Sequence, residues 1–161
     1  MASSKANTRA IALLDKRGIE HRVHEYELEV EADTYGEAVA LQLGVDPSRL
    51  FKTLIATVDG DPVMAIVPVD GRLSLKALAR AAGGKRADLA DPSDAERWTG
   101  YVTGGISPLG QRKRLPAYVH HSVTDHETLF ASAGQRGLQM ELSPSDLLAL
   151  LSAEVADLTA E

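Results

Sequence analysis

Polar and apolar residues follow two periods along the chain, and each change of period marks the border of a predicted element. Where apolar residues recur every three to four positions between a capping residue and a stop signal, we predict helices. These helices cover 8–17, the stretch between Thr34 and Gly44, 75–82, 92–99 and a last segment after Ser143-Pro144. Short apolar runs predict strands over 19–26, 52–58, 62–69, 117–121, 129–133 and 138–142.

Two local signals define parts of this pattern more sharply. Thr34-Tyr35-Gly36-Glu37 has the spacing of a capping box, in which the threonine hydroxyl and the glutamate carboxylate pair with free backbone amides at a helix start. Asp59-Gly60-Asp61 separates two apolar runs and predicts a hairpin turn. Because both runs carry apolar residues on both faces, we expect this hairpin at the centre of a sheet that is covered on each side.

Helices and strands are interspersed without strict alternation, which favours an α+β fold with a mixed, largely antiparallel sheet surrounded by helices. The 161 residues, 44% of them hydrophobic, suffice for a single domain over 1–161 with a continuous core. Since the sequence has no cysteine, disulfides, thiolate metal ligands and a cysteine nucleophile are excluded. No apolar stretch approaches the length of a bilayer span, so we expect a cytoplasmic protein without membrane contact.

The formal charge of −6 at pH 7 argues against a protein that coats duplex DNA by neutralising its phosphates. Basic residues nevertheless gather in Arg112-Lys113-Arg114, with Lys85-Arg86 and Arg136 elsewhere in the chain. Such groups can hold a few phosphates on an otherwise acidic body. A solvated basic loop is the alternative interpretation of the same residues.

Histidine spacing predicts no metal site. His21 and His24 are three positions apart on a predicted strand, and His120 and His121 are adjacent on another. Residues at odd separations on a strand point to opposite faces, so we expect neither pair to chelate an ion. With no cysteine and no His-Glu-x-x-His helix, we predict neither a metal nor another cofactor.

The segment 101–110 is too rich in glycine for a regular helix and too apolar for a solvent-exposed linker. We therefore expect an ordered functional loop. Its serine, Ser107, is followed by Pro108, which restricts the serine to an extended backbone and disfavours a nucleophilic role. The chain also lacks the Gly-x-Ser-x-Gly elbow of serine hydrolases and the glycine motifs that bind nucleotide phosphates.

Lys52 is the most unusual charged residue, because it stands in an apolar strand on the same face as Leu54 and Ala56. A partly desolvated ammonium at this position would attract an anion or a carbonyl oxygen strongly. The alternative is a lysine at the end of a strand whose side chain extends to water.

A set of segments, in fixed order and spacing, resembles the YbaK family, which groups free-standing aminoacyl-tRNA deacylases with the editing domain inserted in bacterial prolyl-tRNA synthetases. The longest is Gly104-Gly105-Ile106-Ser107-Pro108-Leu109-Gly110-Gln111-Arg112-Lys113-Arg114-Leu115-Pro116. The shorter segments are Tyr35-Gly36-Glu37, Leu50-Phe51-Lys52-Thr53-Leu54, Val67-Pro68-Val69, Ala90-Asp91-Pro92, Thr99-Gly100-Tyr101 and Arg136-Gly137-Leu138. The resemblance extends over nearly the whole chain.

This resemblance implies a compact α+β fold with a pocket for the 3′ end of an aminoacyl-tRNA. The family lysine matches Lys52, which would orient or neutralise the terminal phosphate or the aminoacyl group. The family's glycine-x-x-x-proline loop matches Gly104 to Pro108, so Gly104 and Gly105 would bring backbone N–H groups close to the ester carbonyl. The implied substrate-binding residues are Tyr26, Tyr35, Thr53, Ile106, Ser107, Pro108 and Ser132. The basic residues assigned to tRNA contact are Arg112, Lys113, Arg114 and Arg136.

The implied activity is removal of a wrongly attached amino acid from tRNA, without a protein nucleophile and without a cofactor. Cysteinyl substrates of the family use their own thiol to attack the ester, and in relatives that act on alanyl esters a water attacks. The free-standing, whole-chain match favours Cys-tRNA(Pro), with prolyl-tRNA synthetase as an implied partner. The alternatives are an Ala-tRNA(Pro) deacylase, a hydrolase of another small ester, and a non-catalytic module that binds aminoacyl-tRNA or the synthetase.

Overall fold

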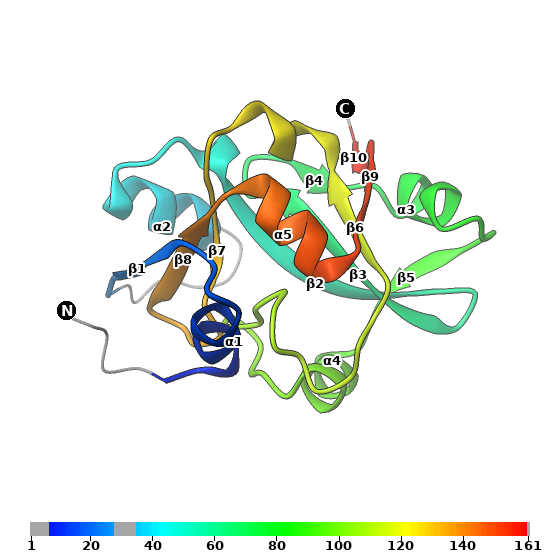
Figure 1. Ribbon diagram of the computed structural model, residues 1–161. Coiled ribbons are helices and arrows are strands. Elements are labelled where there is room, and N and C mark those ends of the chain that lie inside the picture. The colour runs from blue at the N-terminus through cyan, green and yellow to red at the C-terminus, as the bar shows by residue number, and fades with distance from the viewer. Residues whose placement is uncertain (1–6, 28–34, 161) are drawn as a thin grey trace.

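A mixed sheet crosses the molecule, and helices cover both of its faces (Figure 1). The computed structural model describes residues 7–27 and 35–160. The helices are α1 (Arg9–Arg17), α2 (Tyr35–Leu43), α3 (Leu75–Ala81), α4 (Pro92–Thr99), α5 (Pro144–Leu151) and the short 3-10 turns η2 (Pro47–Arg49) and η3 (His121–Asp125). The strands of the sheet are β1 (His21–Glu25), β2 (Leu50–Val58), β3 (Asp61–Pro68), β5 (Ala87–Leu89), β6 (Ala117–His120), β7 (Leu129–Ser132), β8 (Leu138–Leu142) and β9 (Glu154–Ala156). A separate small sheet pairs β4 (Arg72–Leu73) with β10 (Thr159–Ala160).

The hairpin of β2 and β3 lies near the centre of the strand order β1-β8-β7-β2-β3-β6-β9, as the sequence predicts. Asp59 and Gly60 both have positive φ, at 49° and 89°, and such a turn matches the right-handed twist of its strands. In the main sheet, β1·β8, β7·β8, β2·β3 and β2·β5 are antiparallel, whereas β2·β7, β3·β6 and β6·β9 are parallel. The predicted α+β fold with a mixed, largely antiparallel sheet is confirmed.

Helix α1 begins and ends at the residues that its sequence signals indicate. The hydroxyl of Thr8 accepts the N–H of Ile11 at 3.1 Å, and Gly18 ends the helix with φ of 66°. Gly44, with φ of 72°, follows α2. The proposed capping box of α2 depends on Thr34, which lies outside the described residues.

The two faces of the sheet carry separate apolar clusters. Phe51, Ile55, Met64 and Ile66 belong to the cluster that packs against α1 and α5, and α5 crosses the sheet in front of β2 and β3 in Figure 1. The opposite cluster holds alternate residues of the same strands, including Ala65, together with α3. The predicted burial of the hairpin on both faces is therefore confirmed. Among the helices of residues 7–27 and 35–160, none is long and apolar enough to cross a membrane.

One side of β2 is left open between two neighbouring strands. Strand β7 pairs only with Leu50 and Phe51, whereas β5 pairs with β2 from Ala56 onward. The intervening residues 52–55 pair with β3 on their other side. This gap in the sheet positions the candidate site.

Candidate active site

A cavity of about 440 Å³ occupies the gap beside β2. Lys52, Thr53, Leu54 and Ile55 all line it, so residues that point to both faces of the sheet reach the same space. This is possible because the cavity lies at the open side of the strand and not over one of its faces. The other lining residues come from the start of β2, the end of β3, α2, the end of β5, α4, the glycine-rich loop and the β7–β8 hairpin. They are Tyr35, Gly36, Val39, Leu50, Phe51, Val69, Leu89, Ala90, Pro92, Ala95, Thr103, Gly104, Ile106, Ser132, Arg136 and Gln139.

Lys52 is the lysine of this cavity, and its side chain is partly buried. Burial lowers the pKa of its ammonium. Glu37 and Asp70 oppose this shift, whereas Arg72 reinforces it. An ammonium that has lost part of its water shell attracts a substrate oxygen more strongly than a fully solvated one does.

The glycine-rich loop contributes backbone to the lining of the same cavity. Gly104 and Ile106 line the cavity, and neither backbone N–H donates to another described group. Gly104 has φ of 94°, a conformation that glycine adopts without strain. The N–H of Gly105, by contrast, donates to the carbonyl of Val102 at 2.8 Å. Two amides without a partner among the described residues, in the same cavity as a lysine, can stabilise negative charge on a carbonyl oxygen.

Gly105 is needed for close packing of the loop and does not line the cavity. A Cβ atom at this position would lie 2.8 Å from the backbone nitrogen of Arg136 and 3.1 Å from the Cα of Gln135. The loop therefore rests directly on the backbone of the β7–β8 turn. This contact sets the position of Gly104 relative to β2.

Ser107 and Pro108 are buried and do not line the cavity. The hydroxyl of Ser107 accepts the N–H of Leu109 at 3.2 Å, within the loop itself. Beneath them, the hydroxyl of Tyr101 donates to the carbonyl of Leu109 at 2.6 Å, and burial raises the pKa of Tyr101 to about 12. These two hydrogen bonds stabilise the conformation of the loop.

Tyr35 and Arg136 form another part of the cavity wall, and Tyr26 lies behind them. The hydroxyl of Tyr35 shares a hydrogen bond with that of Tyr26, and the guanidinium of Arg136 stacks 4.5 Å from the centre of the Tyr35 ring. Burial and the hydrogen bond from Tyr26 raise the pKa of Tyr35. Tyr35 and Arg136 line the cavity, whereas Tyr26 is a buried residue that positions Tyr35 from behind.

Gln139 is a lining residue that the sequence analysis did not identify. It pairs with Ser132 across β7 and β8, and it is only 6% exposed. Its side-chain oxygen and the hydroxyl of Thr53 are both buried without a hydrogen-bond partner among the described residues. Gln139 alternates with Leu138 and Met140, a pattern that is typical of a polar side chain facing solvent. The sequence pattern therefore does not indicate that Gln139 lines a cavity, and only the structure shows it.

The basic segment lies outside the cavity. Arg112, Lys113 and Arg114 are exposed and absent from its lining, so Arg136 alone of the four predicted tRNA-contact residues lines it. The backbone N–H groups of Arg112 and Lys113 donate to the carbonyls of Thr99 and Trp98, at 2.8 and 2.9 Å. The segment is thus an ordered, solvated strip next to the end of α4.

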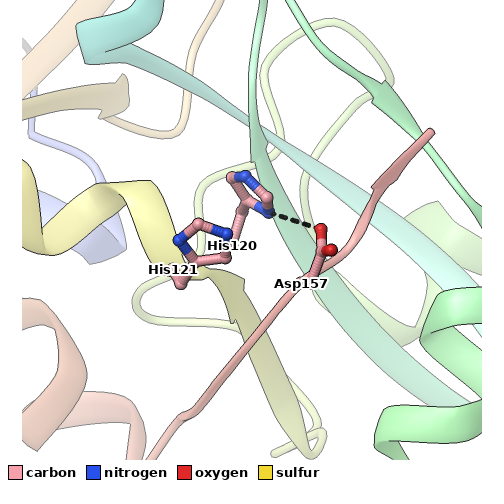
Figure 2. A group of neighbouring side chains, drawn as sticks. All are labelled: His120, His121 and Asp157. Carbon is pink, nitrogen blue, oxygen red and sulfur yellow. Dashed lines mark ion pairs between the residues drawn. The ribbon is translucent and has the colours of Figure 1, made fainter. Parts of the chain in front are cut away.

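The expected orientation of His120 and His121 is wrong. Strand β6 ends at His120, and η3 begins at the next residue, which brings the two ring centres within 4.3 Å. Figure 2 shows both rings near the carboxylate of Asp157, and one ligand atom from each residue lies within 4.8 Å of the others. However, His120 Nδ1 already accepts the N–H of Leu158 at 3.1 Å. A metal on this nitrogen would displace that amide, so the geometry favours a structural role in holding the C-terminal segment.

The structural role of His120 predicts a pH-dependent stability. Burial lowers the pKa of His120 from its ordinary value of 6.5, and His121 acts in the same direction. Three carboxylates oppose the shift: Asp157, Asp125 and Asp70. The neutral ring is thus favoured in the folded state, so stability is lost as the pH falls from about 6.5 towards the lowered value.

We expect the free energy of unfolding in urea to decrease between about pH 7.5 and about pH 5.5, and to decrease less in His120→Asn. The asparagine oxygen can accept the Leu158 amide but cannot be protonated in this range. His121→Gln removes the smaller of the two contributions that lower the pKa of His120, so it should weaken the pH dependence less than His120→Asn does. An equal decrease in wild type and His120→Asn would show that His120 does not control it.

Comparison with known proteins identifies the family. The family model for the aminoacyl-tRNA editing domain matches residues 29–150. A candidate Cys-tRNA(Pro)/Cys-tRNA(Cys) deacylase of Enterococcus faecalis, EbsC, is 34% identical over 99% of this chain and 98% of its own. The multifunctional Ser/Thr-tRNA deacylase ProXp-y of Escherichia coli K12 is 28% identical over 96% of this chain and 93% of its own.

A solved structure gives the same result for the fold. The crystal structure of a candidate trans-editing enzyme for prolyl-tRNA synthetase superposes with a TM-score of 0.84 and 25% identity, over 98% of this chain and 100% of its own. The family model covers β2, the glycine-rich loop and the β7–β8 hairpin, which together build the cavity. The predicted resemblance is thereby confirmed, and the chain belongs to the aminoacyl-tRNA editing domain family.

Proposed function

We propose that this protein is a trans-acting hydrolase that cuts the ester bond of mischarged aminoacyl-tRNA, with Cys-tRNA(Pro) as its main substrate. The observation that carries the proposal is that one cavity is lined both by Lys52 and by Gly104 and Ile106, whose amides have no partner in the part of the chain that the structure describes. An ester carbonyl placed there would meet a cation and two N–H donors as negative charge develops on its oxygen. The names of EbsC and ProXp-y support the reaction class.

The reaction needs no protein nucleophile. The thiol sulfur of a cysteinyl group attacks the ester carbon, so a C–S bond forms while the C–O bond to the ribose breaks. The ribose oxygen leaves with the proton, and the resulting cyclic thioester then reacts with water to give free cysteine. For a substrate without a thiol, water attacks the ester carbon directly. An aminoacyl ester is already activated, so positioning and oxyanion stabilisation account for the rate.

The unpaired polar atoms of Thr53 and Gln139 support a polar side chain on the substrate. A buried donor or acceptor left without a partner costs about 1–3 kcal/mol, which a thiol or hydroxyl of the substrate would recover and a methyl would not. This favours cysteine and serine over alanine, and the thiol adds an internal nucleophile that serine lacks. The Ser/Thr-tRNA deacylase name of ProXp-y supports serine as the second candidate.

Replacement of Thr53 by valine tests this preference. Thr53→Val keeps the shape of the side chain and removes its hydroxyl, so we expect the ratio of kcat/KM for Cys-tRNA(Pro) over Ala-tRNA(Pro) to fall roughly fivefold to tenfold. Thr57→Val, on the same strand but outside the cavity, is the matched control and should leave the ratio unchanged. An unchanged ratio in Thr53→Val would show that this hydroxyl does not contribute to discrimination between the cysteinyl and alanyl substrates.

Single-turnover deacylation by the wild-type chain tests the function itself. With Cys-, Ser- and Ala-tRNA(Pro) in separate reactions and no synthetase present, we expect Cys-tRNA(Pro) to react fastest and Ala-tRNA(Pro) slowest. Binding of all three without release of any amino acid would instead identify a non-catalytic module. Addition of prolyl-tRNA synthetase then measures whether this partner increases the rate.

A further inference from the structure

Two strongly exposed apolar side chains belong to segments that border the cavity. Leu89 is 58% exposed, ends β5 and itself lines the cavity. Val102 is 72% exposed and directly precedes Thr103, which also lines it. The other large apolar side chains that are exposed in the described ranges, Leu41 and Val155, take no part in the lining. Leu89 and Val102 thus place apolar surface at the border of the cavity, where a bound ligand can cover it.

Both side chains are carried on a fixed backbone. Leu89 pairs with Ala56 in the antiparallel ladder of β5 and β2. The carbonyl of Val102 accepts the N–H of Gly105, and the N–H of Thr103 donates to the carboxylate of Glu96, each at 2.8 Å. A ligand that covers these side chains therefore does not have to order a loose loop, which would reduce its affinity.

The chemistry of the substrate determines what lies at this opening. A cavity of about 440 Å³ is near the lower end of small-molecule sites, so it admits the aminoacyl ester and not the tRNA end as a whole. If the ester carbonyl lies beside Gly104, the ribose on its other side must point out of the cavity. The terminal adenine is attached to that ribose and has two flat faces with little polarity. A nonpolar surface at the opening can pack against one of these faces.

We infer that Leu89 and Val102 form an apolar rim against which the terminal adenine of the tRNA lies. The inference rests on the proposed function and adds a recognition element for the nucleoside, distinct from the groups that hold the ester. Because the rim touches no reacting atom, it contributes equally to the ground state and the transition state. Loss of the rim should therefore raise KM and leave kcat unchanged. A protein partner would have to share this opening with the tRNA end, which makes adenine the better occupant.

Adenosine 5′-monophosphate and ribose 5-phosphate are the probes that isolate the base. We expect adenosine 5′-monophosphate to bind the wild type roughly tenfold more tightly than ribose 5-phosphate, as measured by NMR titration. In the double variant Leu89→Ser/Val102→Ser this advantage should fall to about twofold or less, with a matching rise in KM for Cys-tRNA(Pro). Val155→Ser, another exposed valine, is the control and should keep the full advantage.

Each other outcome overturns the inference in a distinct way. An undiminished advantage of the nucleotide in the double variant would show that adenine binds elsewhere, and no advantage in the wild type would show that the base is not recognised. A rise in KM seen only with prolyl-tRNA synthetase present would assign the rim to a protein partner. The titration does not depend on catalysis, so failure of the proposed function appears separately as the absence of deacylation by the wild type.

Discussion

Replacement of Lys52 by alanine is expected to slow deacylation of Cys-tRNA(Pro) at least tenfold, which corresponds to ~1.4 kcal/mol of transition-state stabilisation. The ammonium is partly buried in the cavity that the loop amides also line. In the alanine variant, water that fills its place carries no positive charge to stabilise the transition state. Burial lowers the pKa of Lys52, so the wild-type rate should also decrease as the pH rises through that lowered value. Single-turnover rates measure both effects.

The Lys52 variants should remain folded, which separates catalysis from stability. Because burial disfavours the charged ammonium, Lys52→Met is expected to be at least as stable to heat as the wild type while it shares the loss of activity. Lys76→Ala, an exposed lysine on α3, is the control and should keep the wild-type rate. Equal rates for wild type and Lys52→Met would remove Lys52 from the mechanism.

Gly105→Ala is expected to reduce the rate by a factor of about 10², although Gly105 does not line the cavity. The added Cβ would lie 2.8 Å from the backbone nitrogen of Arg136, so the loop must shift away from the β7–β8 turn. That shift moves the amides of Gly104 and Ile106 away from the ester carbonyl. We also expect a loss of about 1–3 kcal/mol in the free energy of unfolding, from overpacking.

Gly83→Ala is the matched control for this variant. Gly83 has φ of 74° and no atom within 4 Å of an added Cβ, so the substitution strains the backbone without pushing on a neighbour. It should cost about 1–2 kcal/mol of stability and leave kcat unchanged. If Gly105→Ala retained full activity at the same loss of stability, the position of the loop would not matter for the reaction.

Local signals were sufficient where a short segment determines its own structure. The hairpin of β2 and β3 follows from Asp59-Gly60 between two apolar runs, and α1 follows from Thr8 and Gly18. Lys52 stood out because a lysine is unusual in such a strand. The short strands β5 and β9 have three residues each and no alternating pattern, so they form only through pairing with distant strands and were not predicted.

Features that depend on distant contacts were not predictable in the same way. Gln139 follows a pattern typical of a solvent-facing residue, and only the gap between β7 and β5 turns that face into a cavity. The orientation of His120 and His121 depends on β6 ending between them, a boundary that pairing with β3 and β9 determines. Gly105 differs from Gly104 in its environment although the two are adjacent. The backbone of the turn at Arg136 packs tightly against Gly105, whereas an added Cβ at Gly104 would meet only the Arg136 side chain, at 3.9 Å.

A crystal structure with a stable amide analogue, 3′-(cysteinylamino)-3′-deoxyadenosine, tests the catalytic centre most directly. We expect the carbonyl oxygen of the analogue within hydrogen-bonding distance of the N–H of Gly104 or Ile106. The ammonium of Lys52 should contact the same bound molecule. An analogue bound with its carbonyl turned away from the loop, or held at another surface with the cavity beside β2 empty, would contradict this assignment.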